Sequence, residues 1–435
     1  MVLTAFAAAS SRAAAYYPAP TPKSPQQGDR TAGAVGTATA AIATGREVVK
    51  FDFAWRFKLA YQSWRPKLPP PLFANASEAS ADFDDASWAV VDAPHDFLIG
   101  LTYNQTGDET EGAFLPRGQG WYRKHFALPS EYRGRSVWLY FEGVWQQSLM
   151  WLNGVPLDGG NHSNGYTSFA VRLDNHSKVN FGSTPNVLAV HVNALKGSGW
   201  WYEGGGIYRH VNLVSAPLLH FSPDGVFAPA TVLSPVSAGQ AAKARIDARA
   251  TVANHGSSSA QFAVRFDVFD TATGKKVATA QTETSTLALD GSSTVSAPIA
   301  VAPANLWSTT RPYLYTVRAT ILSQSESESE SEFGGSDSPT LLSDGDSVNE
   351  TIGIYTTSWT ADSGFYLNAD HFKIKGFCDH NDFGGVGMAL ADRIHLYKAQ
   401  ALRSVSARPG KKTVPFCPTF YTETEHFTKT GSGQT

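Results

Sequence analysis

Cysteine, charge of a single sign and long apolar runs are all scarce in this sequence of 435 residues. Two cysteines, Cys378 and Cys417, are too few for a disulfide-rich scaffold or an all-cysteine zinc site. The net charge of −3 and the lack of a Lys/Arg stripe give no reason to expect nucleic acid as a partner. No run of about 20 apolar residues occurs, so neither a membrane-spanning helix nor a membrane partner is predicted. No metal-ligand set is recognisable in the sequence, and we predict no cofactor.

Apolar and aromatic residues, by contrast, are plentiful. Apolar residues make up 42 % of the chain and charged residues 17 %, which is the composition of a globular protein with ample material for hydrophobic cores. The length predicts roughly two to four domains. The 11 Trp, 16 Tyr and 25 Phe can fill those cores, and flat rings of this kind also stack on the faces of sugars.

Residues 1–48 are rich in Ala, Pro, Ser, Thr and Gly and show no periodicity, which predicts a disordered leader or a targeting segment. The short apolar run Val2–Ala9 lacks the basic segment that opens a signal peptide. Secretion and a cytoplasmic location therefore both stay open. Five sequons for N-glycosylation are a mild sign of secretion: Asn75, Asn104, Asn161, Asn175 and Asn349.

Residues 49–216 carry the signals of an all-β domain. The runs Ser136–Phe141 and Ser148–Leu152 resemble strands, and Asn153-Gly154 after the second run predicts a tight hairpin turn. Residues 186–193 alternate, with one face formed by Leu188, Val190 and Val192. Short strands broken by Gly, Asn and Pro predict a sandwich or jelly roll.

Residues 217–359 form a second predicted β region. Its strands alternate cleanly, and the number of strands fits an immunoglobulin-like sandwich without its cysteines. The repeat of Ser and Glu at 325–332 cannot bury a core, so it is predicted to be a solvated loop between the last two strands. The apolar positions of the first alternating strand are Ile246, Ala248, Ala250 and Val252.

The character of the sequence changes after Ala361. Residues 372–376 predict a short strand that ends at a glycine, and residues 388–405 have helical spacing. The apolar face of that helix is predicted to hold Leu390, Ile394, Tyr397 and Ala401. Strand, loop and helix together predict the opening unit of an α/β fold within residues 360–408. Residues 409–435 are polar and unrelated in pattern, which predicts a disordered tail.

Several short motifs occur together in a recognisable order. They are Ala93-Pro-His-Asp-Phe97, Gly120-Trp-Tyr-Arg-Lys124, Phe141-Glu-Gly-Val-Trp145 with Trp151-Leu-Asn-Gly154, Trp200-Trp-Tyr-Glu-Gly-Gly-Gly-Ile-Tyr-Arg209, Leu306-Trp-Ser308 with Arg311-Pro-Tyr-Leu-Tyr315, and Phe365-Tyr-Leu-Asn368 with Lys373-Ile-Lys-Gly-Phe-Cys-Asp-His-Asn-Asp382. In this order the chain resembles glycoside hydrolase family 2, which includes β-galactosidases, β-glucuronidases and β-mannosidases. One departure is Tyr355, which stands where the family has an arginine.

The resemblance implies a mainly β fold in three parts. A jelly-roll sugar-binding domain spans 49–216, an immunoglobulin-like sandwich spans 217–359, and the first βα unit of an incomplete (β/α)8 barrel spans 360–408. The implied parent activity is retaining hydrolysis of a β-linked sugar, so a carbohydrate is the expected partner. A β-galactoside is the favoured substrate, because residues 376–392 are most similar to β-galactosidase-like members.

Four residues are candidates for substrate contact. The resemblance implies that His380, at the end of the presumed barrel strand, helps to hold the sugar, and Asp382 follows it closely. Loops at that end of barrel strands build active sites. For Trp200 and Trp201, packing in a core and stacking on a sugar both stay open. For His95 and Asp96 of the Pro-His-Asp motif, a structural role is favoured, in which the side chains tie down a loop through backbone amides.

No catalytic residue is assigned. Retaining hydrolysis needs two carboxylates about 5–5.5 Å apart, and the resemblance places both beyond the first βα unit. The pair Asn349-Glu350 lies before the presumed barrel and is rejected as the catalytic motif. The resemblance fades after Val405, which suggests a truncated chain. We therefore expect this chain to be inactive, although whether it is an enzyme stays open. We also expect residues 365–405 to pack loosely on the second domain.

Two further functions stay open at this point. In the first, the jelly roll alone acts as a non-catalytic carbohydrate-binding module. In the second, the chain serves as an oligomer interface. Exposed, coplanar Trp or Tyr rings on the concave face of the first domain would favour the binding module.

Overall fold

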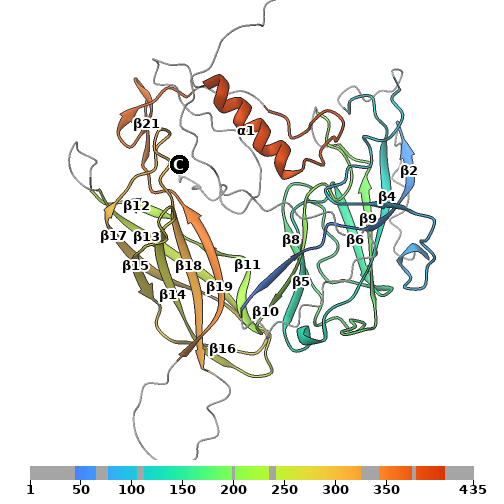
Figure 1. Cartoon of the computed structure of the whole chain (residues 1–435), viewed down its shortest axis with the longest axis horizontal. Helices are drawn as coiled ribbons and strands as arrows, with labels where there is room; N and C mark the ends of the chain where they lie inside the picture. Colours follow the sequence, from blue (N-terminus) through green and yellow to red (C-terminus); the bar gives the residue numbers. More distant parts are fainter. Residues whose placement is uncertain are drawn as a thin grey trace, which may run out of the picture. The chain divides into compact units, whose positions relative to one another are not determined.

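The computed structural model describes residues 45–64, 77–104, 112–197, 201–234, 242–324, 342–374 and 379–406. In these residues the fold is mainly β, as predicted, and α1 (Asp392–Ser406) is the only helix longer than one turn (Figure 1). Several predictions fall outside the described residues: most of the leader, the Ser/Glu-rich loop, the tail from 409 onward, and Trp200. None of the described helices is long and apolar enough to cross a membrane.

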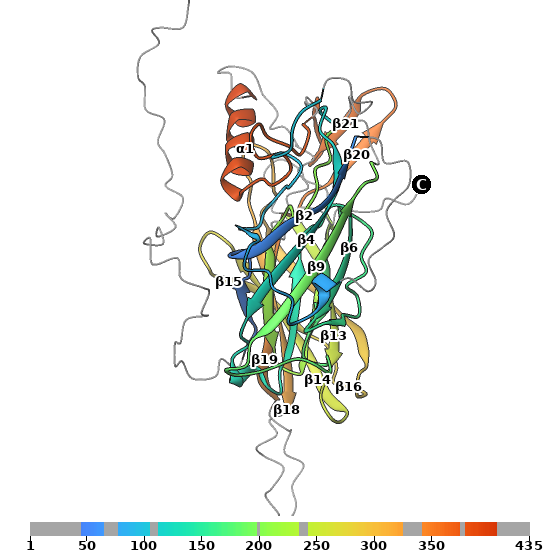
Figure 2. The same cartoon turned by 90° about the vertical axis from the view of Figure 1, so that its right-hand side faces the viewer.

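The first sandwich consists of two antiparallel sheets. One has the order β1-β10-β5-β8. The other has the order β3-β2-β4-β9-β6-β7, of which Figure 2 shows β2, β4, β9 and β6. Two short 3-10 turns, η1 (Ser77–Ala79) and η2 (Ser130–Tyr132), lie in its connections. Its strands are β1 (Glu47–Lys50), β2 (Trp55–Ser63), β3 (Ala89–Val91), β4 (Arg117–Phe126), β5 (Ser136–Phe141), β6 (Gln147–Leu152), β7 (Val155–Pro156), β8 (Phe169–Arg172), β9 (Asn186–Ala194) and β10 (Val211–Ala216).

Strand β9 shows how the core of the first sandwich is built. The face predicted from alternation is confirmed, because Leu188, Val190 and Val192 all lie in the main core between the two sheets. The opposite face of β9 is also covered, since the His191 ring lies 4.9 Å from that of Trp121. The strand is therefore buried on both faces, and its alternation separates two packing environments rather than core from solvent.

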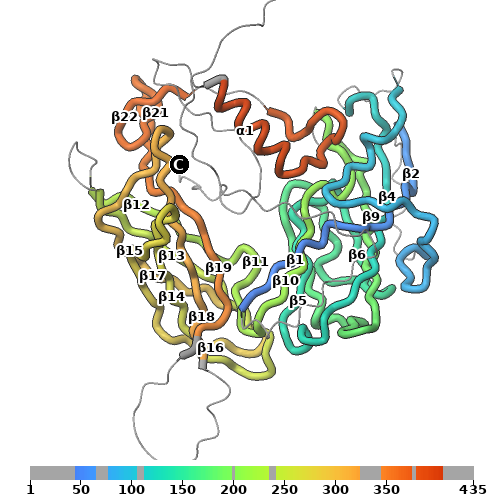
Figure 3. The backbone as a smooth tube through the Cα atoms, in the orientation of Figure 1, coloured from blue at the N-terminus to red at the C-terminus, as the bar shows by residue number. Residues whose placement is uncertain are grey.

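Two local features of the first sandwich can be compared with the sequence predictions: one hairpin turn and the start of the first strand. The predicted hairpin turn is confirmed: Asn153 and Gly154 have φ values of 51° and 84° between β6 and β7. Positive φ at both positions is the geometry of a tight hairpin turn. The chain joins the sheet slightly earlier than predicted, because β1 begins at Glu47, inside the predicted leader, and pairs with β10 (Figure 3).

The second sandwich is also antiparallel. Its sheets have the orders β11-β13-β12, with β17 paired to β13, and β15-β14-β18-β19, with β16 paired to β14. The predicted inward face of β13 is confirmed, and side chains of β14, β17 and β18 pack against it in one core. The strands are β11 (Leu219–Phe227), β12 (Ala230–Val232), β13 (Ala242–Asn254), β14 (Ala260–Asp270), β15 (Lys276–Gln281), β16 (Ser285–Leu287), β17 (Ser292–Ala304), β18 (Tyr315–Gln324) and β19 (Leu342–Ile352).

An ion pair joins the two sandwiches. Arg46, just before β1, pairs with the fully buried Asp346 of β19 at 2.8 Å. The same carboxylate accepts a hydrogen bond from the backbone N–H of Phe221 in β11. The Arg46 guanidinium lies 5.2 Å from the Trp138 ring, and that ring stacks on His220. The joint is therefore a packed, hydrogen-bonded contact.

The region after the second sandwich differs from the prediction. Strands β20 (Thr357–Thr360), β21 (Gly364–Leu367) and β22 (Asp370–His371) form an antiparallel sheet, not a parallel barrel strand. Residues 372–374 lie outside any strand, and 375–378 lie outside the described residues. The expected strand over 372–376 is thus wrong where the structure describes it, because the antiparallel sheet already ends with β22 at His371.

Helix α1 begins at Asp392, later than the predicted start at Met388. Met388 and Leu390 are buried in the loop before it, and Met388 belongs to the core of the first sandwich. At Met388 the expected loose packing on the second domain is therefore wrong. The predicted helix face is also shifted, because Tyr397 is 59 % exposed whereas the Lys398 side chain is only 11 % exposed.

Candidate functional site

The candidate site lies where the loop before α1 meets the first sandwich. Met388 packs into the sandwich core, and its backbone N–H donates to Asp96 Oδ2 at 2.9 Å. Phe383 and Gly387 exchange backbone hydrogen bonds, each at 3.0 Å, which closes the residues between them into a tight turn. This loop carries the predicted residues His380 and Asp382 just ahead of the turn, so both are held close to the sandwich.

Asp96 is the buried polar centre of this contact. Its Oδ1 accepts from the backbone N–H of Leu98 (3.0 Å) and Gly205 (3.1 Å), and its Oδ2 also accepts from the Tyr202 hydroxyl at 2.7 Å. Burial raises the pKa of Asp96, and the four hydrogen bonds to its carboxylate oppose that rise only in part. Asp96 thus ties down a loop, which is the role favoured from the sequence.

His95, beside Asp96, is also structural in its contacts. Its Nδ1 lies 2.8 Å from the Tyr122 hydroxyl, and its ring packs on Phe57 with the centroids 4.9 Å apart. Burial lowers the pKa of His95 to about 4, so the ring is neutral at physiological pH. A neutral, enclosed imidazole of this kind fixes the loop and does not present a charge to solvent.

Trp201 lies beside His380, so the structure brings together two of the predicted site residues. Their ring centroids are 6.1 Å apart at an interplanar angle of 72°. Trp201 is 41 % exposed, and its Nε1–H donates to the hydroxyl of Tyr166, which is 37 % exposed. Tyr166 packs in turn on the buried Trp145, with the centroids 4.7 Å apart. Trp201 and Tyr166 thus form a pair of partly exposed aromatic rings that is held in place by the buried Trp145.

Tyr166 was missed by the sequence reasoning. It lies in the connection from β7 to β8, where no motif or periodicity marks it. Only the folded chain brings it to Trp201, which is far away in the sequence. No signal in the residues around Tyr166 could have found it.

Lys398 is a second residue that the sequence reasoning missed. Its Nζ donates to the backbone carbonyls of His380 (2.8 Å) and Asp382 (3.2 Å), and it pairs with Asp379 at 3.0 Å. One ammonium group thus holds both ends of the segment that carries the predicted sugar contacts. A signal did exist, since Lys398 is four residues after the half-buried Ile394 on α1 and so lies on the same side of the helix.

A chain of three charged groups attaches the start of α1 to the first sandwich. His210 Nδ1 lies 2.8 Å from Asp52 Oδ2, and His210 Nε2 lies 3.1 Å from Asp392 Oδ1. The hydrogen bond to Asp52 raises the pKa of His210, with nearby carboxylates adding to the rise and burial opposing it. The protonated imidazole can donate to both carboxylates at once.

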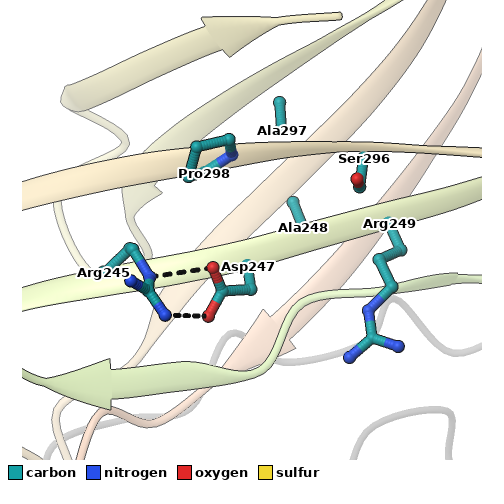
Figure 4. Close-up of a pocket in the computed structure, with 7 residues that line it drawn as sticks. All are labelled: Arg245, Asp247, Ala248, Arg249, Ser296, Ala297 and Pro298. Carbon is teal, nitrogen blue, oxygen red and sulfur yellow. Dashed lines mark hydrogen bonds and ion pairs between the residues drawn. The ribbon is translucent and has the colours of Figure 1, made fainter.

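A surface depression elsewhere does not involve the predicted residues. It lies over β13 and β17 in the second sandwich and has a volume of about 390 Å³ (Figure 4). Arg245 and Asp247 within it already pair with each other through contacts of 2.9 and 3.1 Å. Among the described residues, no group of three or more His, Cys, Asp or Glu side chains is arranged to hold a metal ion. Glu350, rejected above as a catalytic carboxylate, lies in β19 of the second sandwich.

Comparison with solved structures defines the class of protein. A glycosyl hydrolase family 2 member from Bacteroides cellulosilyticus superposes with a TM-score of 0.66 at 28 % identity, covering 82 % of this chain and 41 % of that chain. A β-glycosidase from Bacteroides vulgatus gives a TM-score of 0.65 at 27 % identity, covering 83 % and 41 %. The fold is thus that of the β-sandwich region of glycosidases.

The sequence comparisons narrow the class to a family. The profile of "Glycosyl hydrolases family 2" matches residues 231–334. A putative β-glucuronidase from Formosa agariphila is 30 % identical over 78 % of this chain and 29 % of its own length. A β-galactosidase from Bacteroides ovatus is 31 % identical over 82 % of this chain and 37 % of its own length. The chain belongs to glycosyl hydrolases family 2, and it spans about a third of the length of these two relatives.

Proposed function

We propose that the chain is the β-sandwich portion of a family 2 glycosidase, and that it supplies sugar contacts rather than the hydrolytic carboxylates. The observation that carries the proposal is the meeting of Trp201, on the first sandwich, with His380, on the loop before α1. An aromatic face beside a polar ring is the chemistry that holds a pyranose, because apolar sugar faces stack on rings while hydroxyls seek hydrogen bonds. His380 and Asp382 take the polar role, and Trp201 takes the stacking role.

Hydrolysis by this chain alone is not part of the proposal. Two carboxylates of this region are already engaged, since Asp379 pairs with Lys398 and Asp96 accepts four hydrogen bonds. Retaining hydrolysis needs a nucleophile and an acid/base that face each other across the bond. The resemblance puts both in a part of the family's barrel beyond α1, so we expect no turnover of chromogenic β-glycosides by the 435-residue chain. Stoichiometric, sustained turnover would contradict this expectation.

A β-galactoside is the proposed ligand of the whole enzyme. The similarity of residues 376–392 to β-galactosidase-like members supports it, as does the match to a β-galactosidase relative. The relatives also include β-glucuronidases, so the assay must compare the two sugars. Titration calorimetry of the 435-residue chain with a β-galactoside and with the matching β-glucuronide makes this comparison directly. Preference for the glucuronide would overturn the galactoside assignment.

A matched pair of tryptophan variants tests the stacking role. Trp201→Ala should weaken galactoside affinity roughly twofold to tenfold, the range expected for loss of one ring contact. Trp359→Ala is the control, because Trp359 is 69 % exposed, lies on β20 and packs on Phe365 of the neighbouring strand. Equal effects of the two variants, or no effect of Trp201→Ala, would remove Trp201 from the site.

A non-catalytic carbohydrate-binding module is the second candidate function. The exposed pair of Trp201 and Tyr166 favours it, because both rings belong to the first sandwich. The two candidates differ in whether the loop before α1 takes part. Lys398→Met releases the carbonyls of His380 and Asp382, so it should weaken binding in a glycosidase portion and leave it unchanged in a module that uses the sandwich alone.

A further inference from the structure

We propose that Asp96 is a positioning residue that fixes the loop before α1 against the first sandwich and so places His380 beside Trp201. The inference rests on the proposed function, because it concerns the same sugar contacts. It adds a role for a residue that touches neither the sugar nor any proposed catalytic group.

The four donors to Asp96 come from two separate parts of the chain. Leu98, Tyr202 and Gly205 belong to connections of the first sandwich, whereas Met388 belongs to the loop before α1. One buried carboxylate therefore bridges the two. Its bond to the Met388 N–H is the part of the network that links the loop to the sandwich.

Two glycines show that the chain is shaped around this carboxylate. A Cβ built on Gly204 would lie 2.6 Å from Asp96 Oδ2, and one built on Gly387 would also collide with that oxygen. Both residues have positive φ, at 70° and 60°. Only a residue without a side chain allows the backbone to approach the carboxylate so closely from both sides.

The position of Met388 is transmitted to the predicted sugar contacts. The reciprocal bonds between Phe383 and Gly387 make the intervening turn a closed unit, so fixing Met388 also fixes Phe383. Asp382 and His380 come immediately before that unit, and Lys398 holds their carbonyls from the other side. Release at Met388 should therefore free the loop at the end that faces the sandwich.

Asp96→Asn tests the bridge selectively. The amide keeps the size of the side chain and one acceptor oxygen, which can still serve Leu98 and Gly205. Its NH2 group then faces the Met388 N–H and cannot accept from it. Tyr202→Phe is the matched control, because it removes a different donor to the same oxygen and leaves the Met388 bond in place.

The measurement is hydrogen exchange by mass spectrometry on the full 435-residue chain without sugar. In Asp96→Asn, peptides covering 383–390 should exchange roughly tenfold to hundredfold faster, the range for loss of a hydrogen bond to a charged group. Peptides from β9 and β18 should be unchanged, and Tyr202→Phe should change residues 383–390 by less than Asp96→Asn. Equal protection in wild type and Asp96→Asn would overturn the proposal. So would a uniform loss of protection across the first sandwich, since that would make Asp96 a residue of general stability.

A second variant covers the case in which Asp96→Asn does not fold. Gly387→Ala pushes the loop away from Asp96 and from the Tyr202 ring, which lies 3.0 Å from the added Cβ, without changing any of the sandwich residues that donate to Asp96. It should speed exchange at 383–390 and weaken galactoside affinity, with the unfolding midpoint of the first sandwich nearly unchanged. Affinity is the readout that a purely structural role would not move, and unchanged affinity alongside faster exchange would overturn the positioning role.

The two proposals can fail separately. If wild type binds neither sugar, the proposed function is wrong, while faster local exchange in Asp96→Asn would still support the bridge. If wild type binds galactoside and both variants bind it equally well, the sugar site stands and Asp96 does not position it.

Discussion

Arg123 is a buried charged residue that stabilises the first sandwich. Its replacement by methionine tests how the segment between β2 and β3 is held. The side chain on β4 is fully buried. Its Nε donates to Asp85 Oδ2 at 2.8 Å, and its terminal nitrogens donate to the carbonyls of Glu78, Ser80 and Phe83. One guanidinium thus satisfies four acceptors of the segment between β2 and β3.

The expected cost follows from what methionine leaves behind. Arg123→Met keeps the apolar stem but removes the guanidinium from the buried Asp85 carboxylate, which still has the His125 ring 2.8 Å away. The cost should therefore reach at most the value usual for a buried charge left without its partner, about 3–5 kcal/mol. At a typical slope of about 2 kcal/mol per molar urea, this corresponds to a midpoint lower by about 1.5–2.5 M. The matched control is Lys58→Met, which removes an exposed ion pair to Glu78 of the same segment and should cost about 0–1 kcal/mol.

The loss of stability caused by Arg123→Met should also depend on pH. Burial pushes the pKa of Asp85 upward, but hydrogen bonds from Arg123 and His125 outweigh it and hold the pKa below its usual value. A carboxyl whose pKa is lowered on folding stabilises the fold above its unfolded pKa of about 3.9, and the stabilisation is lost as the pH falls through the folded value. The gap between wild type and Arg123→Met should therefore be full at pH 7 and narrow below about pH 4.

Urea unfolding followed by tryptophan fluorescence measures this gap. The signal reports mainly on the first sandwich and its loops, because eight of the ten described tryptophans lie in residues 45–216. Equal midpoints for Arg123→Met and Lys58→Met at pH 7 would refute the reasoning. A gap that widened in acid would refute the assignment of Asp85 as the charged partner.

Three further predictions concern the joint with α1, the core and a turn. His210→Gln should lower the unfolding midpoint most at pH 5–6, because the charged form of His210 is the stabilising one. The difference from wild type should fade as the pH rises through the raised pKa of His210, and urea melts across pH 5–9 would show this. Met388→Ala should cost about 2–5 kcal/mol in guanidinium melts, because its side chain fills the core of the first sandwich, and a loosely docked loop would show almost no change. Gly154→Ala should cost about 1–2 kcal/mol in the same melts, since its φ of 84° strains a side chain although the added Cβ would meet its neighbours only at ordinary van der Waals distances.

The regular strands were predictable because local pattern and packing agree in them. In β13 the alternation of Ile246 with charged neighbours maps onto one core face and one outer face, as the period of a strand requires. The turn at Asn153-Gly154 was equally predictable, because a two-residue hairpin with positive φ restricts the residue types. In both cases the information lies within a few neighbouring residues.

The sheet after the second sandwich could not be predicted in the same way. Phe365 to Leu367 carry the residue types of a buried strand, but the partner strands decide whether pairing is parallel or antiparallel. In the structure these residues pair antiparallel with β20 and β22, which are their neighbours in sequence. The resemblance to a barrel strand correctly indicated that residues 365–367 form a strand, but it indicated the wrong pairing. Pairing depends on which strands the folded chain brings alongside.

The candidate site shows the same limit more clearly. The sequence marked Asp96 and the glycine-rich stretch that contains Gly204 as separate motifs and gave no reason to connect them with Gly387. The folded chain gives all three a single cause: one buried carboxylate needs backbone on both sides at close approach, and only glycine permits it. A motif read alone suggests either catalysis or a turn. The contacts of Asp96 show that Pro94-His95-Asp96 connects the first sandwich to the loop before α1. The two glycines are the positions at which the backbone comes closest to its carboxylate.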